Sequence, residues 1–309
     1  MAIQILSTGL QTTVQDLGRL RKRHIGMPQS GAFDYLSAAK ANAILGKSIN
    51  SPVLECTMTG PTIKFLKDMQ ICVTGARVSE LKIDDSLVTQ GELLDLKKGN
   101  IFSMNHAKEN LRFYVGFSDD IKATEFLGSV STYLPAKLGG LNGEAIQKDQ
   151  MIDFKKTAAD KSVSAPSFQV KGTFNTSIIR VVAGPEFNLL NMTANELGEN
   201  DYIISNESNR MGIRTVGKKM QIDDGGSMIS KPIYPGMVQC PQNGLPIILG
   251  ADAQTLGGYP RILQVIKADR HLLGQLKPND RFRFNLISIP EAIDEWNILK
   301  KAYPFICEL

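Results

Sequence analysis

Residues 239–261 read QCPQNGLPIILGADAQTLGGYPR, and this stretch places a polar, glycine-rich segment between two apolar runs. The run at 245–249 and the one at 262–266 predict two buried strands. Between them, Gly257 and Gly258 allow positive φ and let backbone N–H groups approach a ligand closely. A polar loop between two buried strands is a common way for a rigid scaffold to present a binding site. The same pattern also fits a plain turn whose polar side chains satisfy the neighbouring backbone.

Length and composition indicate a globular protein. The chain has 309 residues, 42% hydrophobic and 21% charged, so it can bury a large core and is long enough for two domains. Its net charge of +4 is spread along the sequence, so no basic patch is expected. Trp296 is its single tryptophan, which argues against an aromatic surface for stacking bases, so we expect no nucleic-acid partner. The first residues lack the pattern of a signal peptide, and no apolar run reaches membrane-spanning length. We therefore expect a cytoplasmic protein with no membrane contact.

The motifs of several common sites are missing or incomplete. The cysteines show no Cys-x-x-Cys spacing and the histidines lie in separate contexts, which predicts reduced thiols and no metal site. The segment ANAILGKS at 41–48 ends like a phosphate-binding loop, but Ala41 replaces the first glycine and a helix-forming run replaces the flexible loop. The chain also carries no Met-Lys-Met site for biotin attachment.

Short strand-like segments separated by glycine- and aspartate-rich turns dominate the chain from residue 53 onward. Their close, regular spacing predicts an all-β barrel or sandwich rather than alternating strands and helices. A helix is expected over residues 35–45, with Asp34 or Ser37 as its N-cap and Gly46 at its C-terminal end.

Two polar segments are predicted to be irregular. Residues 11–23, QTTVQDLGRLRKR, suit a surface loop better than a helix. Residues 155–167 are rich in small and polar residues, so they are the best candidate for a linker.

Four polar clusters follow one another along the chain, and a family resemblance rests on their combination. They are GLQTTVQDLGR at 9–19 continuing into GAFD at 31–34 and AN at 41–42, LECT at 54–57 with the Gly-Pro at 60–61 and TGA at 74–76, SNESNRMG at 205–212 with Arg214, and residues 239–261. Over nearly its whole length the chain resembles the carboxyltransferase subdomain A and B family, also called allophanate hydrolase subunit 2. It is similar in particular to the branch that supplies the C subunit of 5-oxoprolinase, whose members are biotin-dependent carboxyltransferase-like proteins.

The resemblance implies a mainly β protein made of two linked cyclophilin-like β-barrel subdomains with a few short helices. The first subdomain is expected over residues 1–165, with an N-terminal loop and helix. The second is expected over residues 166–309, with a C-terminal helix, and the two can exchange segments.

The resemblance also implies a subunit, inactive alone, of an ATP-dependent 5-oxoprolinase that opens 5-oxoproline to glutamate. The expected partners are a subunit 1 homologue, which carries carboxyltransferase subdomains C and D, and a subunit of the lactam-utilisation family. ATP is expected at the level of the complex. Two alternatives stay open: a regulatory binding protein that antagonises a histidine-kinase inhibitor, and the carboxyltransferase component of a biotin-dependent, urea-type carboxylase.

The implied chemistry selects candidate residues on the matching motifs. A lactam carbonyl is resonance-stabilised, so activating its oxygen by phosphorylation needs donors for a developing oxyanion and cations for phosphate oxygens. The candidate catalytic residues are Asp16, Arg19, Asp34 and Arg210, with Arg214 and Asp252 as further candidates. The candidate substrate-binding residues are Asn42, Glu55, Ser208, Asn209, Gln254, Thr255, Gly257, Gly258 and Tyr259.

Structural alternatives exist for these residues. Arg210 pairs with Glu207 or Asp252 in one such interpretation, Asp16 and Arg19 form a local salt bridge, and Asn42 caps a turn. Glu55 has apolar neighbours in sequence, so an inward-facing side chain needs a partner or a proton. The family's usual Gly-Ser-Arg-Ser-Thr reads GSVST at 128–132, which puts a valine in place of an arginine.

Overall fold

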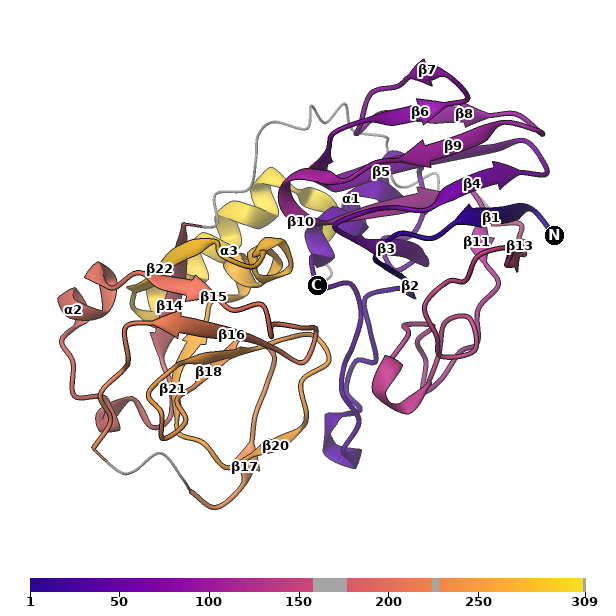
Figure 1. Ribbon diagram of the computed structural model, residues 1–309. Helices are drawn as coiled ribbons and strands as arrows, with labels where there is room; N and C mark the ends of the chain where they lie inside the picture. Colours follow the sequence, from indigo (N-terminus) through magenta and orange to yellow (C-terminus); the bar gives the residue numbers. More distant parts are fainter. Residues whose placement is uncertain (158–176, 224–227, 308–309) are drawn as a thin grey trace. The chain divides into compact units, whose positions relative to one another are not determined.

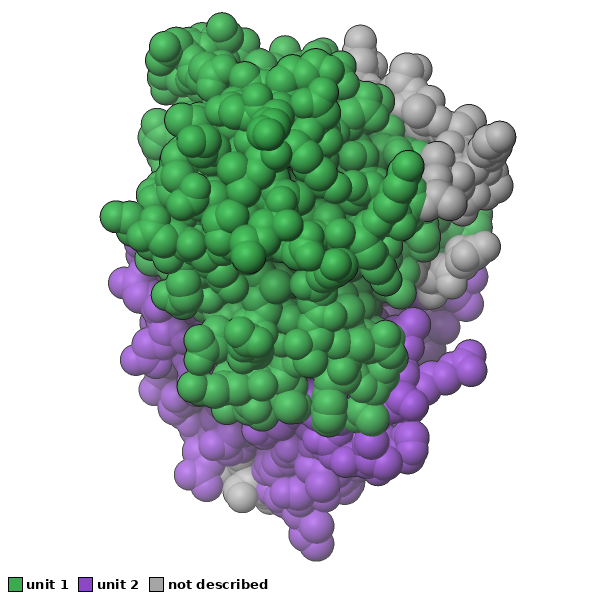
Figure 2. Space-filling view, turned by 90° about the vertical axis from the view of Figure 1, so that its right-hand side faces the viewer, with its two compact units in different colours: residues 1–19, 30–174, 305–309 green, residues 20–29, 175–304 purple. Residues whose placement is uncertain are grey.

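The computed structural model describes residues 1–157, 177–223 and 228–307. The chain divides into two compact units (Figure 2). Unit 1 comprises Met1–Arg19, Ser30–Phe174 and Phe305–Leu309, and unit 2 comprises Leu20–Gln29 and Asn175–Pro304. Residues 20–29 therefore belong to a different unit from their sequence neighbours. The predicted boundary at 165/166 and the linker beyond residue 157 lie outside the described residues.

Unit 1 is built from two antiparallel sheets that share one apolar core (Figure 1). The six-stranded sheet has the order β12 (Met151–Ile152), β1 (Ile3–Ser7), β4 (Thr62–Phe65), β9 (Ile101–Met104), β6 (Leu81–Ile83) and β7 (Ser86–Leu87). The five-stranded sheet has the order β2 (Gln11–Gln15), β3 (Val53–Thr57), β10 (Ala107–Phe117), β5 (Met69–Val78) and β8 (Leu94–Leu96). Phe65 and Phe102 from the first sheet and Phe113 from the second are completely buried in one cluster, so the two sheets stabilise each other.

Shorter elements complete unit 1. Strands β11 (Asp120–Ile121) and β13 (Phe154–Lys155) form a two-stranded sheet, and η2 (Leu134–Ala136) is a single 3₁₀ turn. Helix α1 (Tyr35–Ile44) packs on β3, β5 and β10. The predicted helix is confirmed: Asp34 caps it by accepting hydrogen bonds from the N–H of Ser37 at 2.9 Å and its Oγ at 2.6 Å. Gly46 follows its C-terminus with a φ of +64°.

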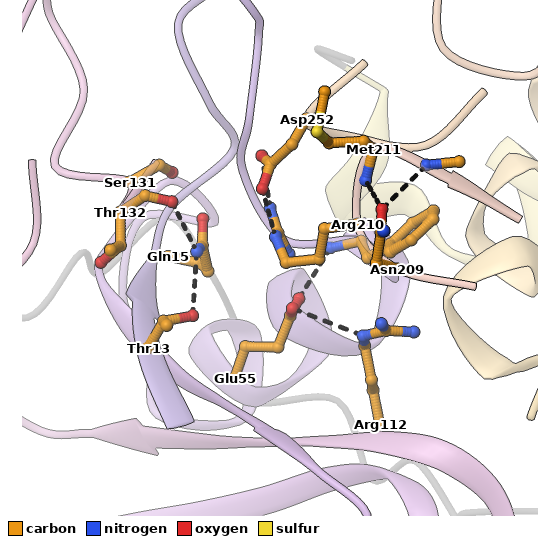
Figure 3. Close-up of polar contacts among 12 residues, drawn as sticks. Thr13, Gln15, Glu55, Arg112, Ser131, Thr132, Asn209, Arg210, Met211 and Asp252 are labelled. Carbon is orange, nitrogen blue, oxygen red and sulfur yellow. Dashed lines mark hydrogen bonds and ion pairs between the residues drawn. The ribbon is translucent and has the colours of Figure 1, made fainter. Parts of the chain in front are cut away.

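The expectation of a surface loop at residues 11–23 is wrong for its first part. Gln11–Gln15 is strand β2, paired with β3, and four of its five residues are buried. Two threonines and a valine favour a strand. Gln15 Nε2 donates to Thr13 Oγ1 at 3.0 Å and to the carbonyl of Thr132 at 3.1 Å (Figure 3).

Unit 2 is organised around a closed seven-stranded barrel (Figure 1). Its order is β14 (Ile178–Ala183), β21 (Arg261–Val265), β18 (Met237–Gln239), β19 (Ile247–Leu249), β16 (Gly212–Gly217), β15 (Tyr202–Ile204) and β22 (Arg281–Leu286). Closure comes from the parallel pairing of β14 with β22, whereas the other neighbours are antiparallel. Tyr202, Phe282 and Phe284 fill the interior, with ring centroids 5.0–5.7 Å apart.

Short helices and one ribbon surround the barrel. The ribbon pairs β17 (Lys231–Pro232) with β20 (Leu256–Gly257). The helical elements are η1 (Arg23–Ile25), η3 (Phe187–Leu189), α2 (Ala194–Glu199), η4 (Lys267–Gln275) and α3 (Ile289–Ala302). The last turn, η5 (Pro304–Ile306), follows α3 in sequence, and from Phe305 onward it belongs to unit 1. The predicted fold class, mainly β with a few short helices, is confirmed. No helix in the described ranges is long and apolar enough to span a membrane.

Candidate functional site

The polar segment at 250–260 connects β19 to β21, and its carboxylate, Asp252, is paired with Arg210. The guanidinium Nε lies 2.8 Å from Asp252 Oδ2, and Nη2 lies 3.0 Å from Oδ1 (Figure 3). Both side chains are buried, at 6% and 3% exposure. The backbone N–H of Asp252 also donates to the carbonyl of Arg210 at 2.9 Å. This two-point pair joins the turn before β16 to the 250–260 segment.

A second arginine, Arg23 of η1, binds the same segment through its backbone. Its guanidinium donates to the carbonyls of Ala253 at 3.2 Å, Gln254 at 2.7 Å and Ile233 at 2.6 Å. It also lies 5.6 Å from the centre of the Tyr234 ring. Burial lowers the pKa of Arg23 from its ordinary value. Sequence reasoning missed this role, since Arg23 lies more than 200 positions from its acceptors and no local pattern marks it.

A third arginine, Arg261, fixes the far end of the segment. It forms a two-point pair with Glu186, with Nε 2.7 Å from Oε2 and Nη2 2.6 Å from Oε1. Its Nη1 donates to the carbonyl of Pro232 at 2.9 Å. Hydrogen bonds from Arg261 lower the pKa of Glu186 from 4.5 to about 2. Sequence reasoning also missed Glu186, which stands alone in a turn.

The two predicted glycines are needed for space rather than for positive φ. Neither Gly257 nor Gly258 is among the residues with positive φ. A Cβ on Gly257 would lie 2.8 Å from Gln239 Nε2, and one on Gly258 would lie 2.9 Å from the carbonyl of Met228. Gln239 Nε2 also donates to the carbonyl of Tyr259 at 3.1 Å. The close packing keeps side chains out of this part of the segment.

The remaining predicted residues of unit 2 divide into turn formers and exposed groups. Ser208 Oγ donates to the carbonyl of Arg214 and accepts from its N–H, at 3.2 and 3.0 Å. Asn209 Oδ1 accepts from the N–H of Met211 at 2.8 Å (Figure 3). These two residues therefore shape the turn that carries Arg210. The other three, Gln254, Thr255 and Tyr259, lie along the 250–260 segment with partly or largely exposed side chains.

In unit 1, Asp16 and Arg19 both hold the loop at 126–131. The Asp16 carboxylate accepts from Ser129 Oγ at 2.6 Å, from the N–H of Val130 at 2.8 Å and from Ser131 Oγ at 2.5 Å. Arg19 is completely buried and donates to the carbonyls of Phe126 at 3.1 Å and of Ser131 at 2.5 Å. These contacts give Asp16 and Arg19 a structural role, which is to hold the 126–131 loop.

Asp34 and Asn42 also have structural partners. Asp34 is the N-cap of α1, and its carboxylate oxygens are bonded to Ser37. Asn42 Nδ2 donates to the carbonyls of Ser51 at 2.8 Å and of Ile49 at 3.3 Å, so it holds the turn after the helix.

Glu55 is inward-facing, and it is the centre of a buried polar cluster in unit 1. Its Oε2 accepts from the N–H of Phe33 and from the hydroxyl of Tyr114, both at 2.8 Å. Its Oε1 lies 3.5 Å from Nε of Arg112 (Figure 3). The same Tyr114 hydroxyl accepts from the N–H of Asp34 at 2.7 Å.

Tyr114 and Arg112 are functional candidates that the sequence did not reveal, because both lie in the apolar strand β10. Arg112 also stacks over the Phe33 ring, 4.7 Å from its centre. Burial raises the pKa of Tyr114 well above its ordinary value, so the phenol stays protonated and donates to Glu55. The cluster therefore fixes a carboxylate among donors in a dry environment.

The site residues thus form two groups, one in each unit. In unit 1, Tyr114 links the Glu55 carboxylate to the backbone N–H of Asp34, and Asp16 and Arg19 lie on a different loop. Unit 2 brings Arg210 and Asp252 together on the 250–260 segment. Within residues 1–157, 177–223 and 228–307, no cluster of three or more histidine, cysteine, aspartate or glutamate side chains is suited to a metal ion.

Comparison with known proteins shows a consistent set of relatives. Residues 25–286 match the family described as carboxyltransferase domain, subdomain A and B. The chain is 33% identical over 292 residues to the C subunit of 5-oxoprolinase from Escherichia coli, covering 94% of this chain and 93% of that protein. For the C subunit of 5-oxoprolinase from Haemophilus influenzae the identity is 32%, with the same coverage. The crystal structure of the Kluyveromyces lactis urea carboxylase superposes with a TM-score of 0.88 at 27% identity, over 98% of this chain and 29% of that one.

The Arg210–Asp252 pair is expected to couple strongly in a double-mutant cycle. We predict a coupling energy of about 2–3 kcal/mol for Arg210→Ala and Asp252→Ala, because removing either partner leaves a buried charge. The measurement is urea unfolding of the four proteins of the cycle. Arg283 and Asp201 form a matched control pair at 2.6 Å, with 51% and 41% exposure, and should couple clearly more weakly because water screens both charges. Equal coupling in the two cycles would contradict this assignment.

The Glu186–Arg261 pair predicts a pH dependence. A carboxyl group whose pKa is lowered by folding contributes stability above its unfolded pKa and loses that contribution as the pH falls toward its folded pKa. For Glu186 this window runs from 4.5 down to about 2. We expect Glu186→Gln to lower the free energy of unfolding by a constant amount at neutral pH. Below about pH 4.5 the difference from wild type should shrink. A difference that stays constant across the acid range would show that the pair does not act in this way.

Proposed function

Because this chain belongs to the carboxyltransferase domain family, subdomain A and B, we propose that it is the C subunit of an ATP-dependent 5-oxoprolinase. The observation that carries this proposal is the end-to-end match to two proteins of that name, at 33% and 32% identity over 93% of each. In the proposed reaction, the complex opens 5-oxoproline to glutamate. The chain alone is inactive, since the reaction needs ATP and further subunits.

The proposed partners are a subunit 1 homologue and a subunit of the lactam-utilisation family. ATP transfers its γ-phosphoryl group to the lactam oxygen in the assembled complex and leaves as ADP. Water then attacks the carbonyl carbon, the C–N bond breaks as the nitrogen takes a proton, and a second water releases phosphate from the resulting acyl phosphate to give glutamate. This chain contributes fixed polar groups: a buried carboxylate with its donors at Glu55, and a segment at 250–260 held by arginines.

A second candidate, a urea-type carboxyltransferase, is favoured by the superposition on the Kluyveromyces lactis urea carboxylase over 98% of the chain. We rank it lower because of the 126–131 loop. Val130 stands where the family pattern has an arginine, and its side chain packs against the core of unit 1. That position therefore supplies no cation for an anionic substrate.

Reconstitution tests the proposed function. We expect the chain, combined with its two partner subunits, 5-oxoproline and ATP, to produce glutamate and ADP in equal amounts. Omitting this chain should reduce the rate at least about 100-fold, since the assembled site is incomplete without it. Equal turnover with and without the chain rejects the proposal. Carboxylation of urea with a biotin carrier and no opening of 5-oxoproline would favour the second candidate.

A further inference from the structure

An apolar hollow lies on the outer face of the unit 2 barrel. Along β16, Ile213 and Thr215 are buried while Arg214 and Val216 are exposed, so the latter two point away from the barrel interior. Ile247 of β19 is the cross-strand partner of Arg214 and is partly exposed. Outward positions of a sheet in water are normally polar. Apolar side chains at two neighbouring outward positions therefore mark this face as unusual.

Arg214, Val216 and Ile247 line a pocket of about 300 Å³. Pro241 and Leu245 extend its apolar surface, and Tyr259 lines it from the 250–260 segment with 43% of its side chain exposed. The volume is at the small end of ligand sites, so it suits a molecule the size of an amino acid.

Two opposite charges border the pocket without neutralising each other. Arg214 and Glu207 both line it and are exposed. Among the residues that the structure describes, the guanidinium of Arg214 and the carboxylate of Glu207 form no ion pair, with each other or with another side chain. By contrast, Arg210 forms an ion pair with Asp252, and Arg261 forms one with Glu186. Ser208 fixes the backbone of Arg214, so the side chain starts from a defined position beside the pocket.

Asn243 adds a neutral donor to this edge. Its Oδ1 accepts from the N–H of Leu245 at 3.0 Å, which orients the side-chain amide and leaves its Nδ2 as a donor. The pocket thus presents a cation, an anion, an amide donor and an apolar surface in one small space.

We propose that this pocket binds a small carboxylate that carries a nitrogen donor beside the carboxylate and an apolar skeleton. Arg214 binds the carboxylate through two parallel hydrogen bonds, and Glu207 accepts from the nitrogen. The skeleton lies on Leu245, Ile247 and Val216. A lactam acid such as 5-oxoproline and a cyclic α-amino acid such as proline share this chemistry. The choice of 5-oxoproline as a ligand rests on the proposed function, whereas the general ligand class does not.

Calorimetric titration of the full chain with three ring carboxylates tests the proposal. We expect 5-oxoproline or L-proline to bind with a Kd below about 1 mM. Cyclopentanecarboxylate, which lacks the nitrogen, should bind at least about tenfold more weakly, because Glu207 then faces no donor. Tighter binding of 5-oxoproline identifies the lactam as the ligand, and tighter binding of proline identifies an amino acid.

Two variants and a control make the assignment specific. Arg214→Gln should weaken binding at least about tenfold, and Glu207→Gln should reduce the preference for the nitrogen-bearing ligand. Arg281→Gln is the matched control, since Arg281 is exposed on β22 of the same barrel and does not line the pocket. No binding by the wild type at about 10 mM of either nitrogen-bearing ligand overturns the proposal. Equal losses in Arg214→Gln and Arg281→Gln overturn it as well.

This test and the reconstitution fail independently. Binding by the isolated chain, with no turnover by the three subunits, rejects the proposed function but supports the proposed ligand site. Turnover by the three subunits, without ligand binding to the isolated chain, rejects the proposed ligand site but supports the proposed function.

Discussion

Arginine side chains that bind backbone carbonyls and buried carboxylates determine the conformation of the segment between β19 and β21. The segment contains only the two-residue strand β20, so a ladder of backbone hydrogen bonds cannot fix it alone. Arg210 and Arg261 hold it through carboxylates, and Arg23 holds it through carbonyls. A guanidinium has five N–H donors in a rigid plane, so one arginine side chain can bind several acceptors at once. This constraint turns an irregular loop into a fixed surface, and Tyr259 of the proposed pocket lies on it.

Unit 1 uses the same physical principle in its own loop. Asp16 and Arg19 look catalytic in a polar motif, yet their contacts go to the backbone and hydroxyl groups of 126–131. A buried charge needs several partners to offset its desolvation, and a loop can supply them. Charged residues that the fold has already used are therefore weaker candidates for ligand binding. Arg214 and Glu207 differ, because their side chains are exposed at the edge of a pocket.

The fold was predictable where local patterns decide it. Helix α1 follows from its cap, and the short strands expected from residue 53 onward include β3, β4 and β22, whose apolar residues largely coincide with buried positions. Strand β2 was missed because a polar edge strand looks like a loop in sequence. The site was predictable only in part: the Arg210–Asp252 pair was among the alternatives, whereas Arg23, Glu186 and Arg112 act on residues far away in sequence.

Hydrogen exchange of the 250–260 segment tests most directly whether arginines hold it. In the wild type, the amides of Asp252 and Ala253, both hydrogen-bonded, should exchange slowly. Replacing Arg23 by methionine should speed their exchange at least about tenfold, whereas replacing the exposed Arg21 by methionine should leave it unchanged. Fast exchange of these amides in the wild type, or equal rates in the two variants, would contradict the account.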